Sequence, residues 1–179
     1  TIKVWDTATG NCVQTLQSHK KKSMISMCLS ADGARLYSVS DGNTIKVWDT
    51  ATGHLLQILQ GHTKWVWSVC LSADGSRLYS GSQDNTIKVW DTATGNCLQC
   101  LQGHTRGVYS LCLSADGTRL CSGSGDNTIK VWDTATGHCV QTLQGHTYCV
   151  WSVCLSADGA RLYSGSGDYT IKVWDTTRP

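Results

Sequence analysis

The chain has 179 residues, of which 40% are hydrophobic and 16% are charged, and its formal net charge is +2. This hydrophobic content is too high for an intrinsically disordered chain, and no run approaches the roughly 18 apolar residues that a membrane helix needs. The small net charge also argues against nucleic-acid binding, because such domains are usually strongly basic. The composition favours a folded protein with neither a membrane nor a nucleic acid as its partner.

The first residues already predict β-strands. Residues 1–6 alternate polar and apolar side chains, as a half-buried strand does, and residues 12–17 form a second short strand. A lysine-rich segment, residues 20–22, separates this pair from the next predicted strands.

The residues from 61 to 102 show one complete set of predicted elements. Residues 66–72 are rich in branched and aromatic side chains and end at an Ala-Asp-Gly turn. Short strands follow at residues 77–80, 86–90 and 97–101, with turn residues between them. No segment keeps the 3.6-residue period of a helix over ten or more residues.

This set of elements recurs along the whole chain. The string TIKVWDT begins at residues 1, 44, 86, 128 and 170, and LSADG begins at residues 29, 71, 113 and 155. The period is 42 residues, with one interval of 43. We therefore treat residues 1–179 as a single repeat domain, in which residues 1–17 complete one unit and the repeats span about 18–60, 61–102, 103–144 and 145–179.

Four short antiparallel strands per repeat cannot bury both faces alone, so neighbouring copies must pack face to face. Gly-His, Ser-Ala-Asp-Gly and Trp-Asp recur in register, and in this the chain resembles the WD40-repeat family. The resemblance implies an all-β propeller of four-stranded antiparallel blades, about four of them in this chain. It also implies a non-enzymatic scaffold that binds other proteins.

The resemblance further implies a buried hydrogen-bond chain from Trp through Ser and His to Asp in each blade. The donors and acceptors of these side chains suit such a chain. The matching residues are Trp90, Ser80, His62 and Asp84; Trp132, Ser122, His104 and Asp126; and Trp174, Ser164, His146 and Asp168.

A Ser, His and Asp together also resemble a hydrolase triad. However, the trio recurs in every repeat, and the Ser hydroxyl is expected to accept a hydrogen bond from the Trp. No G-x-S-x-G elbow is present. All 13 acidic residues are Asp at repeated or turn positions, which leaves none for acid–base catalysis. We expect no enzymatic activity, no cofactor and no metal.

The first repeat departs from the pattern. Gly42 stands where the other repeats have Asp84, Asp126 and Asp168, while Asp41 comes one position early. We therefore expect the first blade to be the least rigid.

The ten cysteines do not predict disulfides. Four of them recur every 42 residues, at 28, 70, 112 and 154, as packing residues would. Cys97 and Cys100 form a CxxC in a predicted strand, where residues three apart face opposite sides. Reduced cysteines indicate an intracellular, cytoplasmic protein.

Positions that break the repeat are the candidates for function, and most are basic or aromatic. The resemblance places them on the narrow-face rim, where partners of the family bind, and their chemistry suits acidic or phosphorylated peptides. The alternative is a purely structural repeat element whose lysines are simply solvated. The candidate rim residues are Lys20, Lys21, Lys22, Lys64, Trp65, Gln83, Arg106, Tyr148 and Tyr169.

Family members usually close with more blades than this chain supplies. The last predicted blade lacks an outer strand, which residues 12–17 could provide. The chain could close on itself as a strained four-blade ring, pair with a second copy into an eight-blade ring, or form part of a longer propeller. We expect the dimer or the longer chain.

Overall fold

The computed structural model describes residues 1–16, 24–40 and 42–176. These residues form strands and turns, and no helix occurs among them. Accordingly, these ranges contain no helix that could span a membrane.

Three four-stranded antiparallel sheets form complete blades, each with its strands in chain order. Blade 1 contains β3 (Met24–Leu29), β4 (Arg35–Ser40), β5 (Thr44–Asp49) and β6 (Leu55–Gln60). Blade 2 contains β7 (Val66–Leu71), β8 (Arg77–Ser82), β9 (Ile87–Asp91) and β10 (Cys97–Leu101). Blade 3 contains β11 (Val108–Leu113), β12 (Arg119–Ser124), β13 (Ile129–Asp133) and β14 (Cys139–Leu143).

The two ends of the chain form incomplete sheets. Blade 4 contains the three strands β15 (Val150–Leu155), β16 (Arg161–Ser166) and β17 (Ile171–Asp175). At the other end, β1 (Ile2–Trp5) and β2 (Cys12–Leu16) form a separate two-stranded hairpin.

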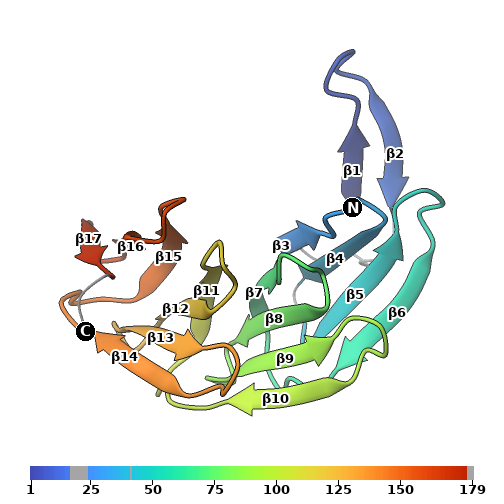
Figure 1. Cartoon of the computed structure of the whole chain (residues 1–179). Helices are drawn as coiled ribbons and strands as arrows, with labels where there is room; N and C mark the ends of the chain where they lie inside the picture. The colour runs from blue at the N-terminus through green and yellow to red at the C-terminus, as the bar shows by residue number, and fades with distance from the viewer. Residues whose placement is uncertain (17–23, 41, 177–179) are drawn as a thin grey trace.

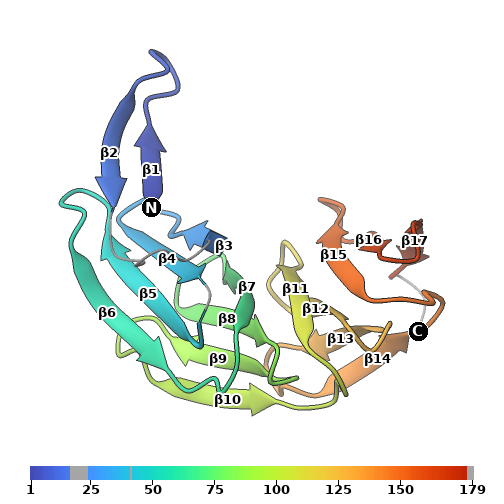
Figure 2. The same ribbon diagram turned by 180° about the vertical axis from the view of Figure 1, so that it is seen from behind.

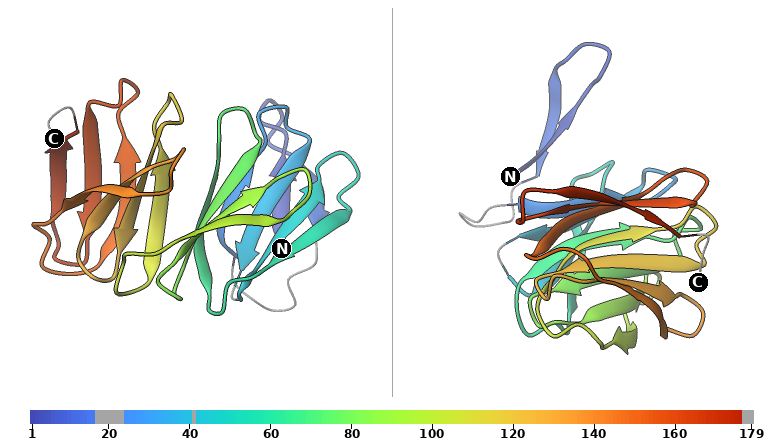
Figure 3. Two further views of the ribbon diagram at one scale, coloured as in Figure 1. Left: turned by 60° about the horizontal axis from the view of Figure 1, so that its bottom comes forward. Right: turned by 90° about the vertical axis from the view of Figure 1, so that its left-hand side faces the viewer.

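The blades follow one another along an open arc, with the hairpin at one end and blade 4 at the other (Figures 1 and 2). The first strands β3, β7, β11 and β15 lie on the inner side of the arc. There β3 contacts β7, β7 contacts β11, and β11 contacts β15. The fourth strands β6, β10 and β14 lie on the outer side. Figure 3 shows the sheets standing side by side, so each interior blade presents both faces to neighbours.

The hydrophobic core lies between adjacent blades. At the junction of blades 2 and 3, Ile87 and Val89 pack with Leu111, Leu120 and Trp132. Equivalent clusters fill the junctions of blades 1 and 2 and of blades 3 and 4. Each blade is therefore stabilised mainly by apolar surface buried against its neighbours.

The turns repeat the same polar contacts. Ser72 Oγ donates to Asp74 Oδ1 at 2.5 Å and accepts from the backbone N–H of Arg77, while Gly75 adopts a φ of +70° that favours glycine. In the turn between β9 and β10, the backbone N–H of Thr94 donates to Asp91 Oδ1. These contacts explain why Asp recurs in the turns.

The expected all-β architecture is confirmed, as are its four-stranded antiparallel blades. The described residues form an incomplete ring of about four blades, because blade 4 has three strands.

Candidate binding surface

The four-residue polar chain of blade 2 is buried and continuous. Trp90 Nε1 donates to Ser80 Oγ at 2.8 Å, and Ser80 Oγ lies 2.7 Å from His62 Nε2. His62 Nδ1 lies 2.8 Å from Asp84 Oδ2. Blades 3 and 4 bring together their own sets at similar distances: Trp132, Ser122, His104 and Asp126; and Trp174, Ser164, His146 and Asp168.

The surroundings of this Trp-Ser-His-Asp hydrogen-bond chain fit a structural role better than a catalytic one. The Ser80 side chain is fully buried and already contacts both Trp90 and His62, so no substrate can reach its hydroxyl. Burial by itself would raise the pKa of Asp84, but hydrogen bonds from His62, Thr86 and the backbone of Thr63 outweigh it and hold that pKa well below its usual range. Among the described residues, no group of three or more His, Cys or Asp side chains could hold a metal ion.

A row of aromatic rings crosses three blades at the start of the inner strands. We call Trp65, Trp67, Tyr109 and Trp151 the aromatic ladder. The ring centroids of Trp65 and Trp67 are 6.1 Å apart, and those of Trp67 and Tyr109 are 5.5 Å apart in an edge-to-face contact. Tyr109 and Trp151 stack at 4.5 Å with an angle of 21° between their planes.

Small residues beneath the rings allow this arrangement. A Cβ at Gly125 would lie 3.0 Å from the Tyr109 ring. A Cβ at Gly167 would clash with the Tyr148 ring and lie 3.2 Å from Trp151 Nε1, so Tyr148 and Trp151 both lie over this glycine. The glycines before the turn Asp residues in blades 3 and 4 thus hold the aromatic rings close to the backbone.

The ladder is open to solvent at both ends and lies beside positive charge. Trp65 is 46% exposed, Trp151 is 49% exposed and Tyr148 is 58% exposed. Burial raises the pKa of Tyr109, and the nearby positive charge of Arg106 opposes that rise.

Most of the rim residues identified from the sequence gather on this edge. Within blade 2, the backbone N–H of Gln83 donates to the carbonyl of Trp65, which ties together the two loops of that blade. Exposed Lys64, Arg106 and Tyr148 occupy equivalent positions in successive blades. Tyr169 is 99% exposed, at the open end of the arc, and makes no ring contact with the ladder. Lys20, Lys21 and Lys22 lie outside the described residues.

Sequence reasoning missed three members of the ladder. Trp67, Tyr109 and Trp151 occupy the second position of β7, β11 and β15, where a repeated aromatic residue suggests packing and not function. The available signal was that all three are aromatic while the same position in β3 is Ile25.

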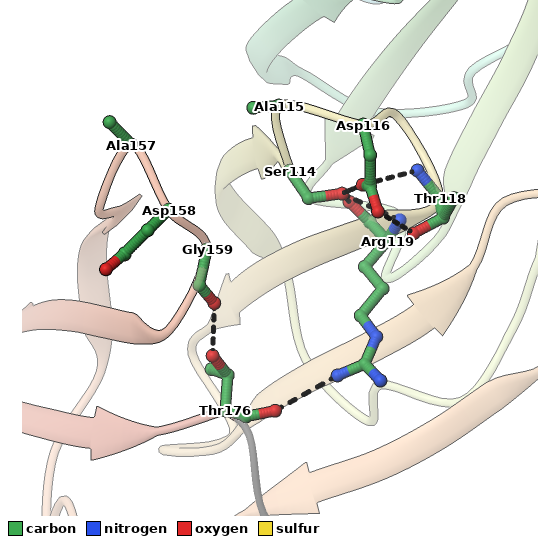
Figure 4. Close-up of a pocket in the computed structure, with 9 residues that line it drawn as sticks. All are labelled: Ser114, Ala115, Asp116, Thr118, Arg119, Ala157, Asp158, Gly159 and Thr176. Carbon is green, nitrogen blue, oxygen red and sulfur yellow. Dashed lines mark hydrogen bonds between the residues drawn. The ribbon is translucent and has the colours of Figure 1, made fainter.

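The opposite ends of the inner strands carry shallow cavities instead. One, of about 400 Å³, lies between the Ser-Ala-Asp-Gly turns of blades 3 and 4 (Figure 4). Its polar groups already bond to one another: Arg119 Nη1 donates to the carbonyl of Thr176 at 3.1 Å, and Ser114 Oγ donates to Asp116. Similar cavities recur between the other blades, so these spaces belong to the repeated turn structure.

Comparison with known proteins identifies relatives of this fold. The family profile described as the WDR3 first beta-propeller domain matches residues 1–176. No curated protein matches the chain. Among solved structures, the one titled "Structure of U3-55K" is similar, with a TM-score of 0.85 and 27% sequence identity. The match covers 92% of this chain and 52% of that one, so this chain spans about half the length of that structure.

Proposed function

Because the chain belongs to the WDR3 first β-propeller family, we propose that it binds partner proteins through the aromatic ladder and the basic residues beside it. WD40 propellers are typically non-catalytic scaffolds that bind other proteins. The proposed ligand is a peptide segment that carries acidic or phosphorylated side chains.

The contacting aromatic rings of three successive blades are the observation that carries this proposal. Trp and Tyr are the residues that most often dominate binding energy at protein interfaces. Three of the rings here, those of Trp65, Trp151 and Tyr148, are about half exposed. Their flat, open faces suit an apolar or aromatic side chain of a bound peptide.

Charge around the ladder favours an anionic partner. Lys64 and Arg106 are exposed at its edge. The carboxylates in the adjacent turns, those of Asp84, Asp126 and Asp168, instead accept hydrogen bonds within their own blades. A guanidinium forms strong, paired hydrogen bonds with carboxylate or phosphate. A peptide that places an acidic group beside an apolar side chain would satisfy both parts of this surface.

The proposal is tested by fluorescence anisotropy with two labelled peptide libraries, one with a fixed phosphoserine and one with serine at that position. We expect the phosphoserine library to bind more tightly. Trp151→Ala should weaken binding at least tenfold, since an aromatic side chain that dominates an interface contributes about 2 kcal/mol. Arg106→Ala should also weaken binding and reduce its dependence on salt.

Trp5→Ala is the matched control, because Trp5 is 54% exposed but lies on the β1–β2 hairpin. It should leave binding unchanged. If neither library binds the unaltered chain, or if Trp151→Ala binds as well as the parent, the peptide site is wrong. The alternative, a purely structural repeat element without its own ligand, would then be favoured.

A further inference from the structure

Blade 3 departs from the other blades at one position of its second strand. Each first strand carries a cysteine, and in blades 1, 2 and 4 that cysteine lies opposite a tyrosine of the second strand. In blade 3, Cys112 of β11 instead lies opposite Cys121 of β12. Of the strand pairs that the structure describes, β11–β12 alone aligns two cysteines. The cysteine–tyrosine pairs of the other blades are Cys28 and Tyr37, Cys70 and Tyr79, and Cys154 and Tyr163.

The register of β11 and β12 suits a covalent link between these two cysteines. Residues directly opposite each other in an antiparallel pair place their side chains on one face of the sheet, with Cα atoms about 4.5–5.5 Å apart. A disulfide needs Cα atoms about 4.4–6.8 Å apart. The thiols of Cys112 and Cys121 already share a hydrogen bond. The backbone of blade 3 can therefore accept a disulfide here without a shift of either strand.

The cysteine pair lies at the junction of blades 3 and 4. Cys121 is 1% exposed and belongs to the apolar cluster that includes Val131 and Val153. The partly buried Cys112 packs against the same cluster. Because the packed side chains keep bulky thiols and disulfides away, the reagent that reaches this pair in the folded chain must be small. A peroxide, which is close to water in size, meets this requirement.

The two thiols differ in acidity. The hydrogen bond with Cys112, helped by the positive charge of Arg119, outweighs burial and lowers the pKa of Cys121. The same hydrogen bond and then burial raise the pKa of Cys112. A thiolate is the form of cysteine that reacts with oxidants, and a neighbouring thiol condenses with the sulfenic acid that results. The pair thus combines a sulfur that is oxidised first with one that completes the disulfide.

We propose that Cys112 and Cys121 form a redox-modification site, at which a peroxide converts the two thiols into a reversible disulfide between β11 and β12. The Cys121 thiolate attacks one peroxide oxygen, the O–O bond breaks, and the released hydroxide takes up the proton that Cys121 gave up. The Cys112 sulfur then attacks the sulfenic acid of Cys121, and its proton leaves with the hydroxyl group as a second water. The two thiols lose two electrons, and the peroxide gains them. A dithiol reductant restores both thiols by exchange.

Peptide mapping tests the link, because Arg119 lies between the two cysteines and is a trypsin site. The folded chain is treated with hydrogen peroxide, its remaining thiols are alkylated, and it is digested without reductant. Trypsin places Cys112 on peptide 107–119 and Cys121 on peptide 120–130, each without another cysteine. We expect mass spectrometry to find these two peptides joined, and dithiothreitol to separate them.

Two variants serve as controls. Cys121→Tyr restores the residue that the other blades have at this position, and Cys112→Ser removes the other sulfur. Both should remain folded by circular dichroism and lose the joined peptides. Oxidation should raise the urea midpoint of the parent chain, because the link restricts the unfolded state. It should not raise the midpoint of Cys121→Tyr. The same midpoint before and after linkage in the parent chain would overturn the stabilising effect of the disulfide.

The proposal is overturned if peptides 107–119 and 120–130 stay separate while the exposed Cys97 and Cys100 are oxidised. A link that forms only after the chain is unfolded in urea would also overturn it. Mixing isotopically labelled and unlabelled chains locates the bond, and joined peptides of mixed label would place it between chains and not within blade 3. The outcome is independent of the peptide site, because Trp151→Ala should form the link as the parent chain does.

Discussion

At the scale of single residues, one serine per blade connects two elements that are distant in sequence. Ser122 Oγ accepts from Trp132 Nε1 at 2.8 Å and lies 2.8 Å from His104 Nε2. The His104 and Trp132 rings also meet edge to face, with centroids 6.1 Å apart. Removing the hydroxyl would leave two buried polar groups without this partner, and such groups are costly.

We expect Ser122→Ala to lower the free energy of unfolding by about 1–3 kcal/mol, the cost of leaving buried polar groups unsatisfied. Ser152→Ala serves as the control, because Ser152 is exposed on the open blade 4 and its loss should cost less than about 0.5 kcal/mol. Urea unfolding followed by tryptophan fluorescence measures both. Equal stability of the two variants would contradict a structural role for the polar chain.

At the scale of elements, blade 1 differs from its neighbours in the turn before β5. Asp84 and Asp126 accept backbone hydrogen bonds from Thr63 and Thr105 of the preceding loops, while Gly42 at the same position carries no side chain. The carbonyl of Gly42 accepts from the backbone N–H of Val66 at 3.0 Å. Residue 42 therefore supplies no carboxylate to this turn of blade 1.

We expect amide hydrogen exchange to be faster in β3–β6 than in β7–β10 and β11–β14, because Gly42 supplies no carboxylate where Asp84 and Asp126 accept hydrogen bonds in blades 2 and 3. Gly42→Asp should slow exchange in blade 1 and leave blade 3 unchanged. Hydrogen-exchange mass spectrometry of the parent chain and of the Gly42→Asp variant measures the exchange rate in each blade. Equal protection of the three blades in the parent chain would show that the missing carboxylate does not matter.

At the scale of the whole molecule, Asp side chains recur in the turns and in the polar chains of blades 2, 3 and 4. Eleven aspartates have a pKa below the usual value of 3.8, and most of these carboxylates accept hydrogen bonds from their own turns. These residues are Asp6, Asp32, Asp49, Asp74, Asp84, Asp91, Asp116, Asp126, Asp133, Asp158 and Asp168. For Asp74 and Asp116 the pKa falls to about 2, with the serine of the turn as the leading cause.

A carboxyl group whose pKa is lower in the folded state stabilises the fold above its unfolded pKa, and this stabilisation is lost as the pH falls toward the folded value. We therefore expect the free energy of unfolding to fall steeply below about pH 4. Urea titrations at a series of pH values measure this. The Asp84→Asn/Asp126→Asn double variant should be less stable at pH 7 and lose less stability between pH 4 and pH 2. If the parent chain and the double variant lost the same free energy of unfolding between pH 4 and pH 2, Asp84 and Asp126 would not be a source of the acid sensitivity.

The sequence determined the repeated features of this protein. The 42-residue period, the alternation within strands and the turn residues predicted the blades, because strand and turn preferences are local. The polar residues at fixed positions in each repeat predicted which side chains could bond, as in Trp90, Ser80, His62 and Asp84. The departure at Gly42 was also visible from alignment of the repeats alone.

Only the tertiary structure decided which residues meet between blades. Trp67, Tyr109 and Trp151 are 42 residues apart and look like packing residues in sequence, yet adjacent inner strands bring their rings into contact at the rim. Val173 and Met27 are likewise exposed whereas their counterparts Val131 and Val69 are buried, because equivalent strands lie between two blades inside the arc and beside only one blade at its ends. Sequence periodicity describes one blade, whereas surfaces and interfaces arise from how successive blades pack.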